Sequence, residues 1–156
     1  MKSFFKNNLD IILTCIAVLI VAGLGTLFVN LGLDWFESLK KPSEWIPNFV
    51  IPVVWSVIYV SFAVIFSLLL KQKLVTKKLI TLSIINGILN ILWCLIFFTL
   101  NQLFLGLITI IINAFFSVLL LVEFSKIRKW YVNILWIYPV WLFIATTLNL
   151  ATWILN

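Results

Sequence analysis

Five long apolar segments, separated by short polar or charged ones, constrain the fold of this chain more than any other feature. Each is about 20 residues long, which is the length that an α-helix needs to cross a bilayer. Their expected bounds are 11–33, 49–70, 79–100, 103–122 and 131–154. Of the 156 residues only 10% are charged, too few for the surface of a soluble domain. The sequence therefore predicts an all-α fold, an integral membrane bundle of five transmembrane helices in a single domain over 1–156.

The basic residues predict the orientation of this bundle. Nine of the eleven Lys and Arg residues lie in the N-terminal tail and in the two loops on the same face. The other two, Lys40 and Lys41, lie in the first loop, 34–48. The positive-inside rule then places the N-terminus in the cytoplasm and the first loop outside, in a bacterial plasma membrane. Because the charges lie between apolar segments, we interpret them as anchors in the lipid bilayer and expect no nucleic-acid partner.

Aromatic residues close to the ends of the expected spans are typical of the belts that membrane proteins place at the headgroup level. The residues concerned are Trp35, Trp45, Trp130, Tyr131 and Trp153. The polar segment 34–48 contains two prolines and is expected to be a loop.

The chain lacks the side chains on which familiar catalysis depends. It has no histidine, and Cys15 and Cys94 lie inside apolar segments without the spacing of metal ligands. No Asp, Glu, Lys or Arg lies in the central part of a span, although such residues mark proton-coupled pathways. We therefore expect no metal, no cofactor and no conventional enzyme activity.

Three spans each carry a stripe of large rings together with hydrogen-bonding or small side chains. At about 100° per residue, the members of each stripe share one helix face. The stripes are Trp55, Tyr59, Phe62 and Phe66; Asn86, Asn90, Trp93 and Phe97; and Tyr138, Trp141, Ala145, Asn149 and Thr152. Because an unpaired Asn is costly in lipid, these faces are expected to point into the bundle. They are interpreted either as packed core or as the wall of a cavity for a flat, largely apolar ligand.

Two smaller features bear on helix packing. Gly106, Thr109, Asn113 and Ser117 form a small-residue stripe, which indicates either internal packing or a homodimer interface. Pro139 is expected to free the Leu135 carbonyl and to kink span five. Pro52, near the start of span two, is tolerated more easily.

Ordered motifs run along nearly the whole chain. Trp35-Phe36, Lys41-Pro42-Ser43 and Pro47 precede Val54-Trp55 and Tyr59; Leu89, Asn90, Trp93, Phe97 and Phe98 follow in span three. Span five has Tyr138, Trp141, Ala145, Leu148, Asn149 and Trp153. This pattern resembles the TspO/translocator protein (TspO/MBR) family, also called tryptophan-rich sensory proteins or peripheral-type benzodiazepine receptors. Departures from the family pattern are Glu44-Trp45, the positions of Pro52 and Pro139, and Thr109, where many members have Asp.

The resemblance implies a receptor or binding protein for porphyrins such as protoporphyrin IX, acting in tetrapyrrole sensing, transport or disposal, with loop 34–48 as the lid of the pocket. It implies that Pro42 and Pro47 stiffen the lid and that the pocket is lined by Trp55, Tyr59, Asn90, Trp93, Phe97, Tyr138, Trp141 and Ala145. An alternative is a light- and oxygen-dependent porphyrin-degrading enzyme in which Trp55 and Trp141 are the catalytic residues. A second alternative is a small exporter of hydrophobic compounds.

Overall fold

The computed structural model describes residues 2–42, 46–47, 49–127 and 129–156, and these contain helices but no strand. Five helical segments of this described part are long and apolar enough to cross a membrane: Leu9–Leu31, Val50–Lys71, Lys77–Thr99, Leu103–Ile127 and Asn133–Leu155. The predicted fold class is therefore confirmed. The largest difference from the expected bounds is in span four, which continues past Val122 to Ile127.

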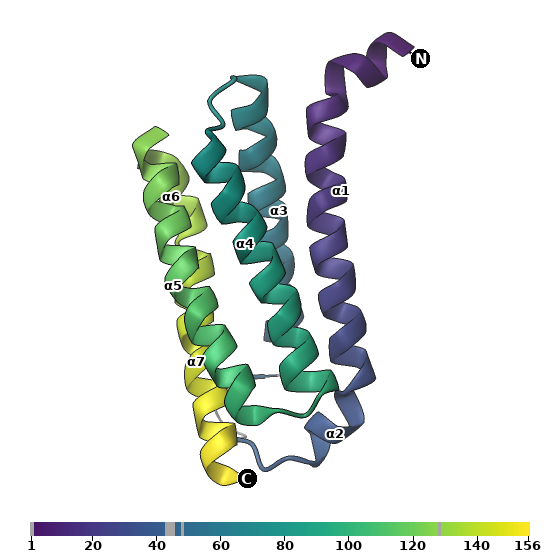
Figure 1. Ribbon diagram of the computed structural model, residues 1–156, viewed down its shortest axis with the longest axis vertical. Coiled ribbons are helices and arrows are strands. Elements are labelled where there is room, and N and C mark those ends of the chain that lie inside the picture. The colour runs from purple at the N-terminus through teal and green to yellow at the C-terminus, as the bar shows by residue number, and fades with distance from the viewer. Residues whose placement is uncertain (1, 43–45, 48, 128) are drawn as a thin grey trace.

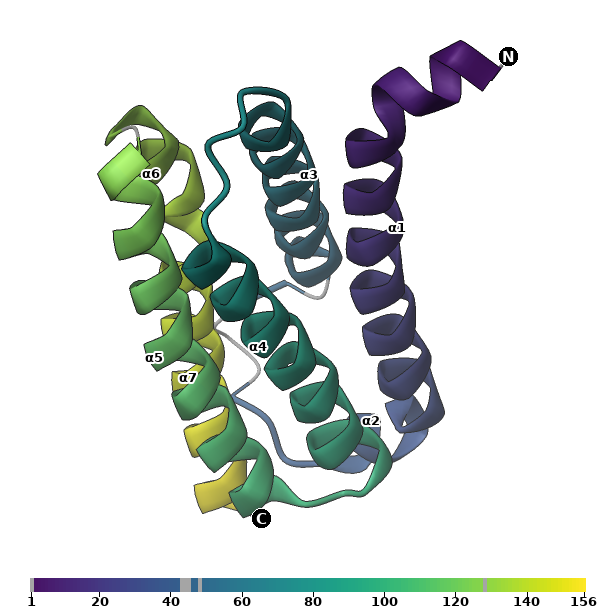
Figure 2. The same cartoon turned by 45° about the horizontal axis from the view of Figure 1, so that its top comes forward.

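The helices run up and down between the two ends of an elongated bundle (Figure 1). In chain order they are α1 (Lys2–Leu31), α2 (Leu33–Ser38), α3 (Val50–Lys71), α4 (Lys77–Cys94), a π-helical turn η1 (Leu95–Thr99), α5 (Leu103–Ile127), α6 (Lys129–Leu135) and α7 (Ile137–Leu155). The N-terminus and the α3–α4 connection lie at one end, and α2 and the C-terminus lie at the other. Helix α5 packs against both α4 and α7, whereas α1, within the described part of the chain, contacts only α2, α3, α4 and η1 (Figure 2).

The connection between α3 and α4 is closed by local hydrogen bonds. Lys73 adopts a left-handed conformation with φ 56°, and the next backbone N–H, of Leu74, donates to the Leu69 carbonyl at 3.0 Å. This geometry satisfies carbonyls that the helix end leaves without partners. The Thr76 hydroxyl then caps α4 by accepting from the Leu79 N–H at 3.1 Å. A sharp reversal between two spans results.

The first loop does not begin where the sequence predicted. Residues Leu33–Ser38 form the short helix α2 instead of loop. Its rings dock on η1: Trp35 lies 6.1 Å from Phe97 and Phe36 lies 5.0 Å from Phe98, between ring centroids. Packing of these two half-buried rings on η1 stabilises a helical turn that the polar composition of the segment does not favour by itself.

Span five consists of two helices rather than one kinked helix. α6 ends at Leu135, α7 begins at Ile137, and the interruption falls at Trp136. Pro139 is the third residue of α7. In the first turn of a helix the backbone N–H groups make no intrahelical hydrogen bond, so a proline there costs none. Its ring excludes a bond to the Leu135 carbonyl, so the helix breaks one turn before the proline, at the carbonyl that the sequence predicted to be freed.

The belt interpretation is wrong for Tyr131. Trp130 and Trp153 are 46% and 41% exposed, but Tyr131 is fully buried in the cluster that contains Phe124 and Leu135. Successive helical residues point about 100° apart, and here Trp130 lies on the exposed side of α6 while Tyr131 points into the bundle. Trp35 is half-buried against Phe97. Trp45 lies outside the described residues.

The small-residue stripe of α5 is used for packing within the chain. Gly106, Asn113 and Ser117 are all buried, and a Cβ at Gly106 would lie 2.8 Å from the Phe97 ring. Thr109 is only partly buried, and its hydroxyl donates to the Leu105 carbonyl of its own helix. Gly106 therefore allows α5 to approach η1 closely.

Candidate functional site

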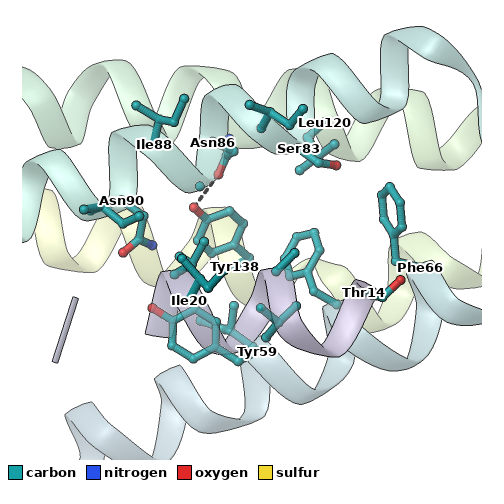
Figure 3. A pocket seen from close by; sticks show the side chains of 18 of the residues that line it. Thr14, Ile20, Tyr59, Phe66, Ser83, Asn86, Ile88, Asn90, Leu120 and Tyr138 are labelled. Atoms are coloured by element: carbon teal, nitrogen blue, oxygen red, sulfur yellow. Dashed lines mark hydrogen bonds between the residues drawn. The ribbon is translucent and has the colours of Figure 1, made fainter. Parts of the chain in front are cut away.

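A cavity of about 670 Å³ lies between α1, α3 and α4 (Figure 3). One residue each from α5 and α7, Leu120 and Tyr138, completes its wall. The α1 side is mainly aliphatic, the α3 side is mainly aromatic, and the α4 side alternates aliphatic with polar residues. Its size falls within the roughly 300–1,000 Å³ of small-molecule sites.

The aromatic wall comes from the predicted stripe of α3. Trp55, Tyr59, Phe62 and Phe66 are all half-buried and all line the cavity. Trp55 stacks on Tyr59 at 5.6 Å between centroids, and Phe62 meets Tyr138 edge to face at 5.4 Å. The helical spacing thus places a nearly continuous ring surface along one side of the cavity.

The α4 wall carries the polar groups. Ser83, Asn86 and Asn90 share one helix face and line the cavity. The Tyr138 hydroxyl of α7 donates a hydrogen bond to Oδ1 of Asn86, and the two side chains point toward each other in Figure 3. The same hydroxyl lies 3.4 Å from Oδ1 of Asn113 on α5. Both α4 asparagines are buried, at 4% and 3% exposure, as their stripe predicted.

Four of the ten predicted ligand contacts line this cavity: Trp55, Tyr59, Asn90 and Tyr138. Four others, Trp93, Phe97, Trp141 and Ala145, are buried in the adjoining core cluster and are not among its lining residues. Trp93 stacks on Trp55 at 6.3 Å, and its Nε1 donates to Oδ1 of Asn149 at 3.2 Å. Trp93 therefore packs against the cavity-lining ring of Trp55 without lining the cavity itself.

The two tryptophans of the photochemical alternative have different surroundings. Trp55 lines the cavity, whereas Trp141 is 6% exposed within the core cluster, and its ring N–H has no partner in the described part of the chain. One helix turn later, Ala145 is also in that cluster. Sequence periodicity placed them on the same face as Tyr138, and all three are indeed buried, but periodicity does not say which neighbour each side chain meets.

The two lid prolines do not line the cavity. Pro42 is half-buried and Pro47 is exposed, while 43–45 and 48 of the lid, with the Glu44-Trp45 departure, lie outside the described residues. The beginning of the first loop is hydrogen-bonded to Asn156, the residue that follows α7. The Lys40 N–H donates to Oδ1 of Asn156 at 3.1 Å, and Nδ2 of Asn156 donates to the Lys40 carbonyl at 3.0 Å.

The sequence did not identify the contribution of α1. Thr14, Ala17, Ile20 and three further residues of α1 face the cavity. The helix is almost uniformly aliphatic, so no stripe marks the face that it turns to α3 and α4. Ser83 had no signal of its own, and Asn86 was recognised as part of an inward face but not as a ligand contact.

The fold and the cavity define a class of protein: a multi-pass integral membrane protein with a ligand-sized cavity inside a five-helix bundle. The sequence model of the TspO/MBR family matches residues 11–154, and the chain belongs to this family. The resemblance found in the motifs is therefore confirmed.

Relatives come from bacteria, archaea and animals. Protein CrtK of Rhodobacter capsulatus is 31% identical over 127 residues, covering 78% of each chain. The translocator protein of Homo sapiens is 28% identical and covers 78% of this chain and 75% of its own. The tryptophan-rich protein TspO of Archaeoglobus fulgidus is 24% identical over 155 residues, or 96% of this chain and 99% of the relative.

Proposed function

We propose that this protein binds porphyrins such as protoporphyrin IX, and similar flat hydrophobic molecules, inside the membrane. The observation that carries the proposal is the cavity of about 670 Å³ between α1, α3 and α4. Its wall combines an aromatic surface with a small number of hydrogen-bonding groups, which is the usual composition of a site for a large apolar ligand.

The aromatic wall supplies the binding surface. A flat conjugated ligand can stack on Trp55 and Tyr59, whose rings are already roughly parallel, with 27° between their planes. Trp93, stacked behind Trp55 and hydrogen-bonded to Asn149, restrains the orientation of the Trp55 ring. A ring held in place before binding loses little conformational entropy when a ligand arrives.

The charges around the cavity favour one orientation of a porphyrin. None of the described lining residues is charged, so a carboxylate inside the cavity would be buried without a counter-ion. The lining reaches Leu70 and Ile80, close to the exposed residues Lys71 and Lys77. In our proposal the ring system occupies the cavity and the propionate edge lies at this basic end of the bundle.

The cellular setting of this function is also part of the proposal. The nine-to-two distribution of Lys and Arg supports an orientation with the basic end in the cytoplasm of a bacterium and the first loop outside the plasma membrane. The carboxylates of a bound porphyrin then face the cytoplasm.

Titration of purified protein in lipid nanodiscs with protoporphyrin IX tests the proposal. Tryptophan fluorescence should fall saturably at one porphyrin per protein, because Trp55 lies in the cavity wall. Protein-free nanodiscs with a tryptophan octyl ester correct for partition into lipid. Quenching that never saturates, or that equals the partition control, would contradict porphyrin binding.

A further inference from the structure

Three buried polar atoms on the α4 wall of the cavity have no hydrogen-bond partner among the residues that the structure describes. They are Oγ of Ser83, Nδ2 of Asn86 and Oδ1 of Asn90. Buried polar groups in proteins are nearly always paired, because an unpaired one loses its hydrogen bonds to water without compensation. Three on one face of one helix, all lining the same cavity, indicate a place where a ligand supplies the partners.

Asn86 is the best defined of the three. Its side-chain oxygen accepts from the Tyr138 hydroxyl, so the orientation of the amide group is fixed from the opposite wall. Both protons of Nδ2 are left as donors without a partner. At 4% exposure the group cannot turn to water. Asn86 therefore presents an oriented donor to whatever occupies the cavity.

The chemistry of the acceptor follows from what surrounds Asn86. No described lining residue is cationic, and Lys77 lies nine residues away on α4, about 14 Å along the helix axis. A carboxylate at this depth would have one amide donor and no counter-ion. A neutral carbonyl, ether or ring nitrogen needs only the single donor that Asn86 supplies.

We infer that Asn86 is a ligand-anchoring residue that selects uncharged hydrogen-bond acceptors, above all carbonyl groups, on flat apolar ligands in this cavity. The inference rests on the proposed function, since it concerns the same cavity, and it adds a specificity that the apolar wall alone cannot provide. Asn90, one helix turn and about 6 Å along α4, has its unpaired oxygen on the same wall. It can accept from a neutral donor on the same ligand edge.

A matched pair of probes isolates the Asn86 contact. Anthraquinone carries two carbonyl groups, and anthracene has the same three-ring frame without them. In Asn86→Leu the anthraquinone affinity should fall about threefold to tenfold, which is the effect of one hydrogen bond. The anthracene affinity should stay unchanged. Equal anthraquinone affinity in wild type and folded Asn86→Leu would overturn the inference.

Asn113→Leu is the control for an indirect effect. Asn113 also lies beside the Tyr138 hydroxyl, but it is fully buried and does not line the cavity. If Asn86 acts only by holding Tyr138, the two variants should change anthraquinone binding alike. If Asn86 donates to the ligand, Asn113→Leu should keep the wild-type ratio of the two probe affinities.

A spectroscopic measurement on the wild type needs no variant to fold. The infrared carbonyl band of bound anthraquinone should move to lower frequency than in protein-free nanodiscs, because a hydrogen bond weakens the C=O bond. An unshifted band overturns the inference while leaving porphyrin binding intact. Failure of the porphyrin titration, by contrast, overturns the proposed function itself.

Discussion

For Trp55 and Trp141, the neighbouring side chains determine whether an inward-facing tryptophan lines the cavity or is packed in the core. Each lies on an inward helix face that the sequence predicts, but only Trp55 lines the cavity. Trp55→Leu should weaken protoporphyrin IX binding by about 0.5–1.5 kcal/mol, the typical value of one aromatic contact. Fluorescence titration of wild type and Trp55→Leu with protoporphyrin IX measures this loss of affinity.

Trp141→Phe provides a comparison, because it changes a tryptophan of the adjoining core that does not line the cavity. It should bind porphyrin with wild-type affinity. Any light-driven loss of porphyrin should depend on Trp55 more than on Trp141. The opposite order, with Trp141→Phe the weaker binder, would place the ligand in the core cluster instead.

Ala145 tests the packing around Trp141. It is 7% exposed within the core cluster, so a Leu there has no free space to occupy. Ala145→Leu should destabilise the bundle by about 1–3 kcal/mol through overpacking, with little change in the porphyrin affinity of the folded fraction. Thermal unfolding in detergent, with the half-buried Ala151→Leu as control, measures this. A stable Ala145→Leu that loses porphyrin binding would show that Ala145 lines the ligand site after all.

At the scale of elements, the end of α1 meets η1 at its backbone. A Cβ on Gly32 would lie 1.9 Å from the carbonyl oxygen of Phe98, so only glycine fits there. Gly32→Ala should force the two elements apart and lower stability by about 1–3 kcal/mol. Thermal unfolding monitored by circular dichroism would measure this loss.

Gly23, within α1, provides the control for Gly32, which directly follows the last residue of that helix. A Cβ at Gly23 meets nothing within 4 Å, so Gly23→Ala should be neutral or should stabilise α1 by up to about 1 kcal/mol. If both alanine variants unfold at the wild-type temperature, α1 does not pack against η1 as described.

The sequence predicts the helices of this protein better than their irregularities. Apolar length alone indicates all five spans, and helical periodicity correctly turns Asn86, Asn90 and Tyr138 inward. The helix α2 and the π-helical turn η1 could not be predicted, because both depend on rings of Trp35 and Phe36 docking on Phe97 and Phe98. Such contacts join segments far apart in the chain and leave no local pattern.

The candidate site was predicted in part for the same reason. An amphipathic stripe identifies an inward face, and this was enough for Trp55, Tyr59 and Asn90. A stripe does not say whether the inward-facing side chain meets packed neighbours, as Trp141 does, or a cavity, as Tyr138 does. The aliphatic α1 wall gives no stripe at all. Only the packing of the helices decides where the cavity lies.

At the scale of the whole molecule, the asymmetry of basic residues predicts the orientation. Ser38 and Gln72 are both exposed and lie at opposite ends of the bundle. In a background with Cys15→Ala and Cys94→Ala, an impermeant thiol reagent should label Ser38→Cys in intact cells and Gln72→Cys only after lysis. Labelling in the reverse order would invert the orientation, and labelling of both in intact cells would contradict five spans.

If a flat apolar ligand occupies the space between α1, α3 and α4, a bulky side chain placed in that space should exclude the ligand. Ala17 lines the cavity from α1, whereas Ala22 on the same helix does not. Phenylalanine is well tolerated in membrane spans, so both Ala17→Phe and Ala22→Phe should fold. Protoporphyrin IX titrated into each variant in nanodiscs should bind Ala22→Phe as it binds wild type and bind Ala17→Phe at least tenfold more weakly, roughly 1.4 kcal/mol. Equal affinity of all three proteins would place the porphyrin elsewhere and contradict the account.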